Sequence, residues 1–256
     1  MDLVNLFGAS GYALTAFLFL SLALVLLTRW RGRLYAGWLV LVALANAAWA
    51  GVLAAQVAWQ GVAVNWIWAL ETLRDLSWIL FLLRLLEVRF RERPAVAGRL
   101  RLLRKAAVAL ALVMMLPLED MATRVPLMVS VDWVTVRLVL EVLFPLVGLV
   151  FAEQVYRNSP AEHGGAVKFL CLGVGALFAY DFFLFSDAFV FDRLDSDLWL
   201  ARGAANAFVV PLIALSVARS PEWTFDLTVS RKVAFHTTSL VAAGIYLLIM
   251  ALAGYY

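Results

Sequence analysis

Eight long apolar segments, separated by short polar stretches, dominate the hydrophobic pattern of the chain. Each segment comes close to the roughly 20 residues that an α-helix needs to cross a bilayer. The predicted transmembrane helices are residues 6–28, 34–57, 65–86, 102–118, 131–156, 166–190, 198–218 and 233–256. The pattern therefore predicts an all-α fold, a polytopic transmembrane helix bundle of about eight spans.

The composition excludes a soluble domain. Hydrophobic residues make up 64% of the 256 residues, and charged residues only 15%. A soluble domain of this size needs far more polar surface. The single cysteine, Cys171, excludes an intrachain disulfide and a four-thiolate metal site. The net charge of +3 does not indicate nucleic-acid binding, because the basic residues collect in loops on one side of the predicted bundle.

The distribution of these basic residues predicts the orientation in the membrane. Fifteen of the 21 Lys and Arg residues fall in the loops after the first, third, fifth and seventh predicted spans. The loops after the second, fourth and sixth hold only Arg124 and Arg193. The positive-inside rule therefore predicts that the odd-numbered loops are cytoplasmic and that the N-terminus is outside.

This orientation divides the chain into three predicted parts. Residues 1–218 form a seven-span membrane bundle, residues 219–232 a cytoplasmic connector, and residues 233–256 an eighth span. The eighth span would end on the outer side without a tail, as the first limb of a hairpin. We therefore expect the chain to be part of a longer protein.

Polar residues inside the predicted spans are the main functional signal. Glu71, Arg74 and Asp75 lie within residues 65–86, at spacings that place them in one sector of the helix. The predicted topology puts further polar residues at the same central-to-outer depth: Arg137, Glu141, Asp181, Asp187, Arg202 and Asn206. A charge that faces lipid is costly, so we expect these side chains to point inward and to pair.

Two interpretations of this polar layer stay open. In one, the arginines neutralise the carboxylates and hold the helices together. In the other, the layer lines an outward-opening pocket that binds a ligand or a proton. The residues of that pocket would be Glu71, Arg74, Asp75, Arg137, Glu141, Asp181, Arg202 and Asn206. Five acids against three arginines leave an excess of negative charge, which favours a role beyond pairing, and Pro145 predicts a bend beside Glu141.

No pattern in the sequence is typical of a catalytic, cofactor or metal site. A haem between spans needs two histidines at matching depth, and only His236 lies in a predicted span. A retinal Schiff base needs a lysine in mid-helix, whereas Lys168 and Lys232 lie at the edges of spans. Neither an HExxH nor a GxSxG motif is present. We therefore predict no catalytic residues, no cofactor and no metal.

Short motifs in the last third of the chain resemble those of a known family. They lie in residues 180–188, 198–214, 221–223 and 230–256, and include Tyr180-Asp181, Arg202-Gly203, Asn206-Ala207, Pro221-Glu222-Trp223 and Ser230-Arg231-Lys232. Their order and spacing resemble the membrane region of the PrsK family, the histidine kinases of exosortase (PEP-CTERM) systems in Gram-negative bacteria. The resemblance covers about residues 180–256, whereas the earlier spans fit only in hydropathy and loop charge.

The resemblance implies both a function and a setting. It implies the N-terminal membrane sensor, or input domain, of a two-component histidine kinase that regulates exopolysaccharide and exosortase-linked genes. The protein would lie in the lipid bilayer of the bacterial inner membrane as a multi-pass homodimer. A further span would follow residue 256, and then a cytoplasmic kinase core through which the protein would act on a cognate response regulator. The alternative is a small secondary transporter or another proton-coupled membrane protein that uses the polar layer; a third possibility is a scaffold that only anchors and dimerises the kinase.

Overall fold

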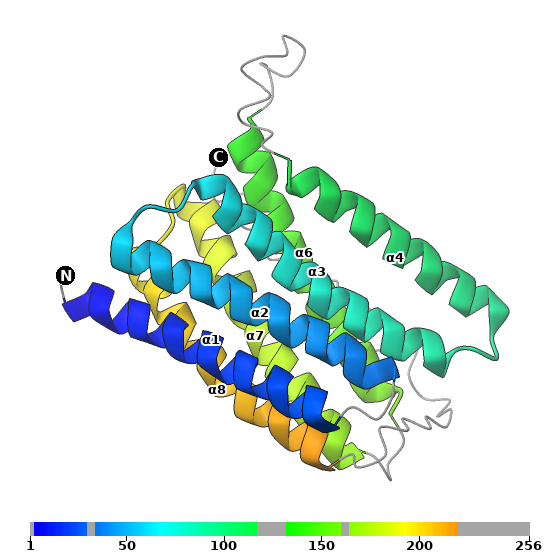
Figure 1. Ribbon diagram of the computed structural model, residues 1–256. Helices are drawn as coiled ribbons and strands as arrows, with labels where there is room; N and C mark the ends of the chain where they lie inside the picture. The colour runs from blue at the N-terminus through cyan, green and yellow to red at the C-terminus, as the bar shows by residue number, and fades with distance from the viewer. Residues whose placement is uncertain (1–2, 30–33, 117–131, 160–163, 220–256) are drawn as a thin grey trace.

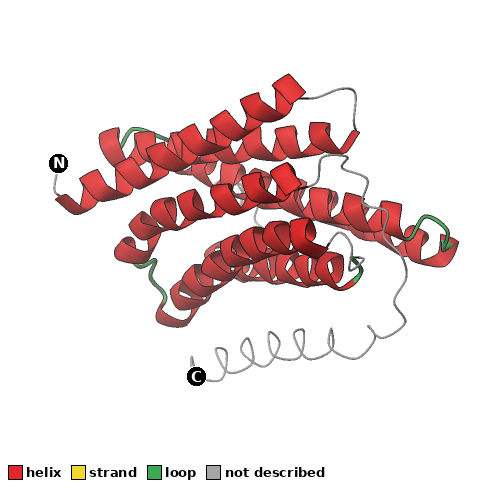
Figure 2. Cartoon of the chain, turned by 90° about the horizontal axis from the view of Figure 1, so that it is seen from below, coloured by secondary structure: helices red, strands yellow, loops and turns green. Residues whose placement is uncertain are grey.

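The computed structural model describes residues 3–29, 34–116, 132–159 and 164–219 (Figure 1). These residues form α-helices joined by short loops and turns, and none of them lies in a β-strand (Figure 2). The seven helices are α1 (Leu3–Arg29), α2 (Leu34–Trp59), α3 (Val64–Arg89), α4 (Pro94–Met114), α6 (Trp133–Arg157), α7 (Gly164–Phe191) and α8 (Ser196–Arg219). The all-α class is confirmed. The predicted connector beyond Arg219 and the predicted span 233–256 lie outside the described residues.

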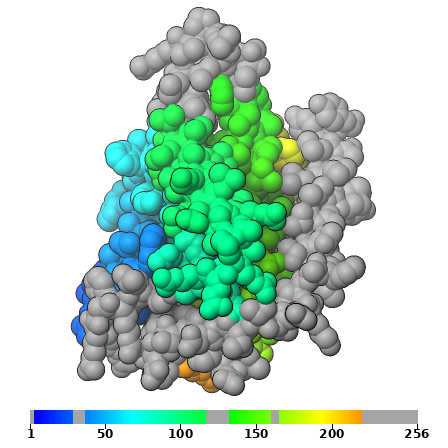
Figure 3. All heavy atoms as spheres, turned by 90° about the vertical axis from the view of Figure 1, so that its right-hand side faces the viewer, coloured from blue at the N-terminus to red at the C-terminus, as the bar shows by residue number. Residues whose placement is uncertain are grey.

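Six of these helices close into a ring. Going round it, α1 packs against α2, α2 against α3, α3 against α6, α6 against α7, and α7 against α8, which returns to α1 (Figure 1). The fourth helix, α4, lies beside the ring against α3, and it covers the face that Figure 3 turns toward the viewer. Large side chains such as Trp78, Phe81 and Phe178 are fully buried inside the bundle. The ring thus has an interior that is shielded from both water and lipid.

Five of the described helices are long and apolar enough to cross a membrane: α1, α2, α6, α7 and α8. The chain is therefore a polytopic helical membrane protein. The prediction of about eight spans is not met in the described residues, because α3 and α4 do not reach this standard. Both are long enough, with 26 and 21 residues, but both carry many charges. In α3 the charges begin with Glu71, Arg74 and Asp75, and in α4 they are basic residues of its first half.

The beginning of α4 differs from the prediction by two turns. The sequence predicts a cytoplasmic loop up to about residue 101, whereas the helix begins at Pro94. Proline favours the first position of a helix, because its fixed φ suits that position and its missing N–H is not needed there. Leu100 is buried and Val96 packs against the same core, so the basic segment already presents an apolar side to α3. The basic residues from Arg99 to Lys105 therefore lie on a helix.

Aspartates outside the helices mark where two of them begin. Asp132 accepts hydrogen bonds from the backbone N–H groups of Val134 and Thr135 and from the Thr135 hydroxyl, at 3.1, 3.2 and 2.6 Å. These hydrogen bonds lower the pKa of Asp132, the Thr135 hydroxyl most of all. Asp195 caps α8 in the same way, and the backbone N–H of Leu198 lowers its pKa. Both caps satisfy N–H groups that have no partner within the helix.

Helices α1 and α8 approach each other closely where both carry glycine. A Cβ atom placed on Gly203 would come within 2.6 Å of the backbone nitrogen of Tyr12, and one on Gly11 within 2.9 Å of that of Ala204. The Thr15 hydroxyl donates to the carbonyl of Gly203 at 2.6 Å, and the Tyr12 hydroxyl to that of Trp199 at 2.5 Å. Small residues allow such close backbone approach in membrane helices. This crossing closes the ring next to the buried polar residues of α8.

Candidate functional site

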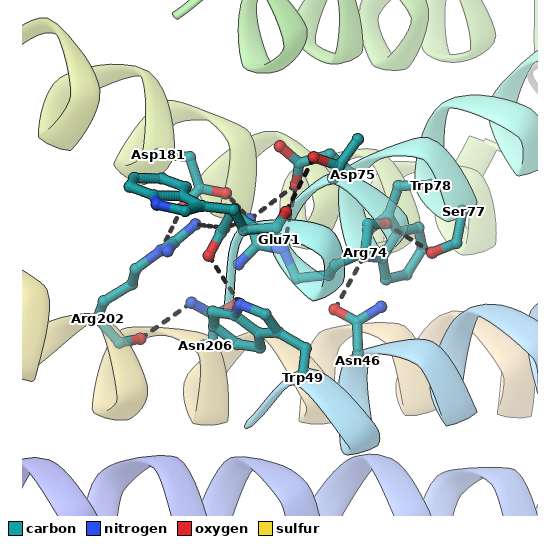
Figure 4. A network of polar contacts seen from close by, with 12 residues as sticks. Asn46, Trp49, Glu71, Arg74, Asp75, Ser77, Trp78, Asp181, Arg202 and Asn206 are labelled. Atoms are coloured by element: carbon teal, nitrogen blue, oxygen red, sulfur yellow. Dashed lines mark hydrogen bonds and ion pairs between the residues drawn. The ribbon is translucent and has the colours of Figure 1, made fainter. Parts of the chain in front are cut away.

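A network of buried ion pairs lies inside the ring, between α3, α7 and α8 (Figure 4). Its charged members are Glu71, Arg74, Asp75, Asp181 and Arg202, and each is completely buried. The spacing of Glu71, Arg74 and Asp75 on α3 turns all three toward the interior, as the helical period predicts. Asp181 comes from α7 and Arg202 from α8, so three helices supply the charges.

Arg202 joins two acids that lie on different helices. Its Nε donates to Asp181 Oδ1 at 2.6 Å, and its Nη2 forms a hydrogen-bonded ion pair with Glu71 Oε1. Figure 4 shows the guanidinium of Arg202 directed at both carboxylates. A fork of N–H donors suits this double recognition better than the single ammonium of a lysine. Arg202 therefore ties α8 to α3 and to α7 at once.

Arg74 makes a second bridge from the side of α3. Its Nη2 forms a hydrogen-bonded ion pair with Asp181 Oδ2. Its Nε and Nη2 also donate to Oδ1 of the neighbouring Asp75, at 3.1 and 2.9 Å. Nη2 lies 3.7 Å from Glu71 Oε1 as well. Asp181 thus holds one arginine with each of its two oxygens.

Trp49 of α2 completes the network with an uncharged side chain. Its indole N–H donates to Glu71 Oε2 at 2.8 Å. The Cζ atoms of Arg74 and Arg202 lie 4.2 and 5.0 Å from the centroid of its ring. Cation–π attraction at such distances stabilises a guanidinium that has left water. Tyr12 packs edge-on against the same indole at 5.6 Å, which connects the network to α1.

Two buried asparagines flank the charged residues. Asn46 accepts a hydrogen bond from the Trp78 indole N–H at 3.2 Å and donates to the carbonyl of Val42. Asn206 lies one turn from Arg202 and donates to its carbonyl at 2.9 Å. The Oδ1 atom of Asn206 has no hydrogen-bond partner among the described residues. Asn206 therefore borders the network without taking part in its ion pairs.

Glu141 of α6 is buried beside the network, and its exposed fraction is 1%. Neither of its carboxyl oxygens has a hydrogen-bond partner in the described part of the chain. Its charged neighbours include Glu71 and Asp75 of α3, Arg202 of α8 and Arg137 of its own helix. A buried carboxylate without a hydrogen bond is costly, because nothing replaces the water it has lost. Glu141 is therefore the least satisfied acid of this region.

The structure places Arg137 and Asp187 away from the ion pairs. Arg137 is buried, donates to the carbonyl of Leu116 at 3.4 Å, and lies 5.4 Å from the ring of Trp68. Asp187 is half-buried and forms none of the hydrogen bonds or ion pairs of the network. Of the eight residues predicted for a pocket, five share the network, while Arg137, Glu141 and Asn206 lie beside it.

The five buried ion-pairing residues do not line an open cavity in this conformation. All are completely buried, and three acids face two arginines, which leaves a formal charge of −1. Glu141 adds a further carboxyl group without a partner. Nη1 of each arginine and Oδ2 of Asp75 also have no hydrogen-bond partner within the described ranges. The arrangement is a closed set of ion pairs with spare hydrogen-bonding capacity.

Trp49 belongs to the network although it carries no charge. Trp49 was not a predicted site residue, because an isolated tryptophan in an apolar helix gives no signal of its own. Trp49 follows Asn46 by three residues, which places it on the same side of α2 as the buried Asn46 amide. Asn46, a polar residue inside an apolar helix, is therefore the signal in the sequence that could have indicated this side of α2.

No group of three or more His, Cys, Asp or Glu side chains in the described ranges has an arrangement that could hold a metal ion. No family model matches the chain, and neither a curated protein nor a solved structure matches it significantly. The site is therefore interpreted from its own geometry and chemistry.

Proposed function

We propose that this chain is the membrane input region of a sensor histidine kinase related to the PrsK family of exosortase systems. The motif resemblance of residues 180–256 supports this assignment. Two residues of the resembling motifs are also members of the buried network. Asp181 belongs to the first resembling segment and Arg202 to the second. The ion pair between them joins the two segments in space.

The proposed topology has all seven described helices crossing the inner membrane, with the N-terminus outside. Burial of the α3 charges supports a crossing by α3, because Glu71, Arg74 and Asp75 face protein partners and not lipid. The basic residues near the α3–α4 turn support a cytoplasmic position of that turn. In the same proposal, residues 219–232 are the cytoplasmic connector and residues 233–256 an eighth span; a ninth span then returns to the cytoplasm and precedes the kinase core.

The observation that carries the proposed mechanism is the imbalance of the network. Two arginines serve three acids, and Glu141 lies beside them without a hydrogen-bond partner. A proton or a cationic ligand that enters from the outer side changes this balance and favours a different packing of α3, α6, α7 and α8. Such a signal acts only through its different affinity for the two packings. The shift would reach the cytoplasm through α8, which leads directly into the connector.

The test uses the complete kinase in its native membrane. Glu141→Gln imitates the protonated acid, and Arg202→Gln removes the bridge between α3 and α7. We expect each to change the basal output of a response-regulator-dependent reporter by about fivefold or more, the lower end of typical coupling energies. Asp187→Asn is the matched control, since Asp187 lies outside the network, and it should leave the output unchanged.

Two results would contradict the proposal. One is wild-type output from both Glu141→Gln and Arg202→Gln at equal amounts in the membrane. The other is a complete reading frame without a kinase core. The transporter alternative makes a separate prediction: proteoliposomes of the chain would move protons, measured with an enclosed pH-sensitive dye, and Glu141→Gln would stop that movement.

A further inference from the structure

A basic cleft opens between the end of α3 and the first half of α4. Its volume is about 450 Å³, and it is lined by Arg84, Glu87, Val88, Arg91, Ala97 and Arg101. The cleft lies near the α3–α4 turn, far along α3 from the buried network at Glu71 and Asp75. We call it the α3–α4 basic cleft. It plays no part in the proposed sensing mechanism.

The charges of the cleft are strongly unbalanced. Glu87 is its single carboxylate, and Oε2 of Glu87 accepts from Nη1 of Arg84 at 3.2 Å and from Nη1 of Arg104 at 2.9 Å. Arg91 and Arg101 are exposed, and neither forms an ion pair with a described residue. Four arginines thus meet one carboxylate, which leaves a formal charge of +3. Such an excess attracts an anion, and guanidinium forks match phosphate oxygens.

The position of the cleft identifies the source of that anion. The turn belongs to the basic end of the bundle, where Arg89, Arg93 and Lys105 add further charge. Within a few turns, α4 becomes apolar and exposes Leu102, Leu110 and Leu112. A phosphate bound in the cleft would therefore have apolar helix surface beside it, as the headgroup of a phospholipid does. Basic pockets between helices on the cytoplasmic side typically hold anionic headgroups.

We propose that the α3–α4 basic cleft binds the phosphate of an anionic phospholipid of the cytoplasmic leaflet. Glu87 holds Arg84 and Arg104 in place, and Arg91 and Arg101 supply the unpaired guanidinium groups that contact the phosphate. The bound lipid anchors the turn at the membrane surface and fixes the otherwise weakly packed α4 against α3. This proposal is independent of the kinase assignment, but it rests on the proposed topology, in which α3 and α4 cross the membrane and their turn lies on the cytoplasmic side.

The test measures lipid binding by native mass spectrometry on the complete chain in detergent. The probes are phosphatidylglycerol and, as the uncharged comparison, phosphatidylcholine. We expect a preference for phosphatidylglycerol that falls about fivefold with Arg91→Gln and again with Arg101→Gln, as a loss of one surface charge predicts. Arg101→Lys should retain more of the preference than Arg101→Gln. The matched control is Arg99→Gln, an exposed charge on the same helix that does not line the cleft.

Three outcomes would overturn the proposal. The first is an equal loss with Arg99→Gln, which would mean general attraction to the basic surface. The second is unchanged phosphatidylglycerol binding in the Arg91→Gln, Arg101→Gln double variant. The third is displacement of the lipid by millimolar inorganic phosphate, which would make free phosphate the ligand. Because both replaced side chains are exposed, thermal unfolding of the variants should match that of the wild type, and this confirms that they fold.

Discussion

Asp181 holds the buried network together more than any other acid. One of its oxygens accepts from Arg202 and the other from Arg74, so both guanidinium groups depend on it. Asp75 has the opposite character. Its Oδ1 accepts twice from Arg74, while its Oδ2 has no partner among the described residues. The same residue type, equally buried, therefore has two different roles in one network.

We predict that Asp181→Asn destabilises the protein far more than Asp75→Asn. The first change leaves two buried arginines short of charge, which typically costs about 3–5 kcal/mol. The second keeps the Oδ1 acceptor and removes excess negative charge, so its cost should stay below about 1 kcal/mol. Unfolding of both variants in detergent, followed by circular dichroism against denaturant, measures the difference. Equal losses of stability would show that the network does not depend on Asp181 in this way.

The sequence predicts the polar layer at residue level only in part. The spacing of Glu71, Arg74 and Asp75 is enough to place them on one side of a helix, and the cost of exposing charge to lipid turns that side inward. The pairing of Arg202 with Glu71 could not be predicted, because it depends on which helices are neighbours in the ring. The separation of Asp187 from the network follows from the helical period, because six residues after Asp181 bring it to a different side of α7, about 9 Å further along the axis.

At the scale of elements, the crossing of α1 and α8 sets the spacing of the bundle next to the network. The nearest atoms to a Cβ on Gly11 or Gly203 belong to the backbone of the opposite helix, and the Tyr12 ring carbon Cγ lies close to Gly203 as well. Backbone atoms cannot give way without moving the whole helix. Tyr12 and Thr15 then use the short distance to hydrogen-bond carbonyl groups of α8.

Gly203→Ala should therefore separate the two helices. We expect a loss of about 1–3 kcal/mol, the usual cost of overpacking. Gly51→Ala in α2 is the matched control, because no atom lies within 4 Å of a Cβ at that position. Alanine is the better helix former by roughly 0.5–1 kcal/mol, so the control should be neutral or slightly stabilising. Denaturant unfolding of the two variants checks this, and a stable Gly203→Ala variant would contradict the close crossing.

Prediction of the elements succeeded where apolar residues are continuous. The predicted spans for α1, α2, α6, α7 and α8 agree with the helices to within a few residues. A helix that crosses lipid is defined by its length and its apolar character, and both can be read from the sequence. It failed at the start of α4, where arginine density indicated a loop. The apolar side formed by Val96 and Leu100 is too short to stand out in a hydropathy pattern, although it is enough to pack on α3.

At the scale of the whole molecule, the proposed topology depends on α3. By hydropathy α3 falls below the standard that five other helices meet, yet it lies in the ring between α2 and α6. Asp181 of α7 and Arg202 of α8 form ion pairs with the charged side chains of α3. These pairs lower the energetic cost of burying the α3 charges. The proposed crossing of the membrane by α3 therefore depends on these neighbours.

Labelling of single cysteines tests whether α3 crosses. In a Cys171→Ser background, Gly61→Cys before α3 and Glu92→Cys after α3 place one thiol at each end of the helix. We expect a membrane-impermeant maleimide to label position 61 in spheroplasts, and position 92 only after the membrane is opened. Labelling of both positions in intact spheroplasts would mean that α3 does not cross. The two sites lie in short loops at the helix ends, so neither replacement alters the core.

The closed ring also has a consequence for biosynthesis. The helix made first, α1, can contact its neighbour α8 only after the five described helices between them have left the ribosome. The α7–α8 hairpin carries Asp181 and Arg202 as an ion pair within itself, so it can enter the bilayer already neutralised. On α3, the two acids Glu71 and Asp75 have only one nearby residue of opposite charge, Arg74. In the proposed topology, α3 would therefore enter the membrane before the hairpin that pairs its charges has been made, and it would need shelter until then.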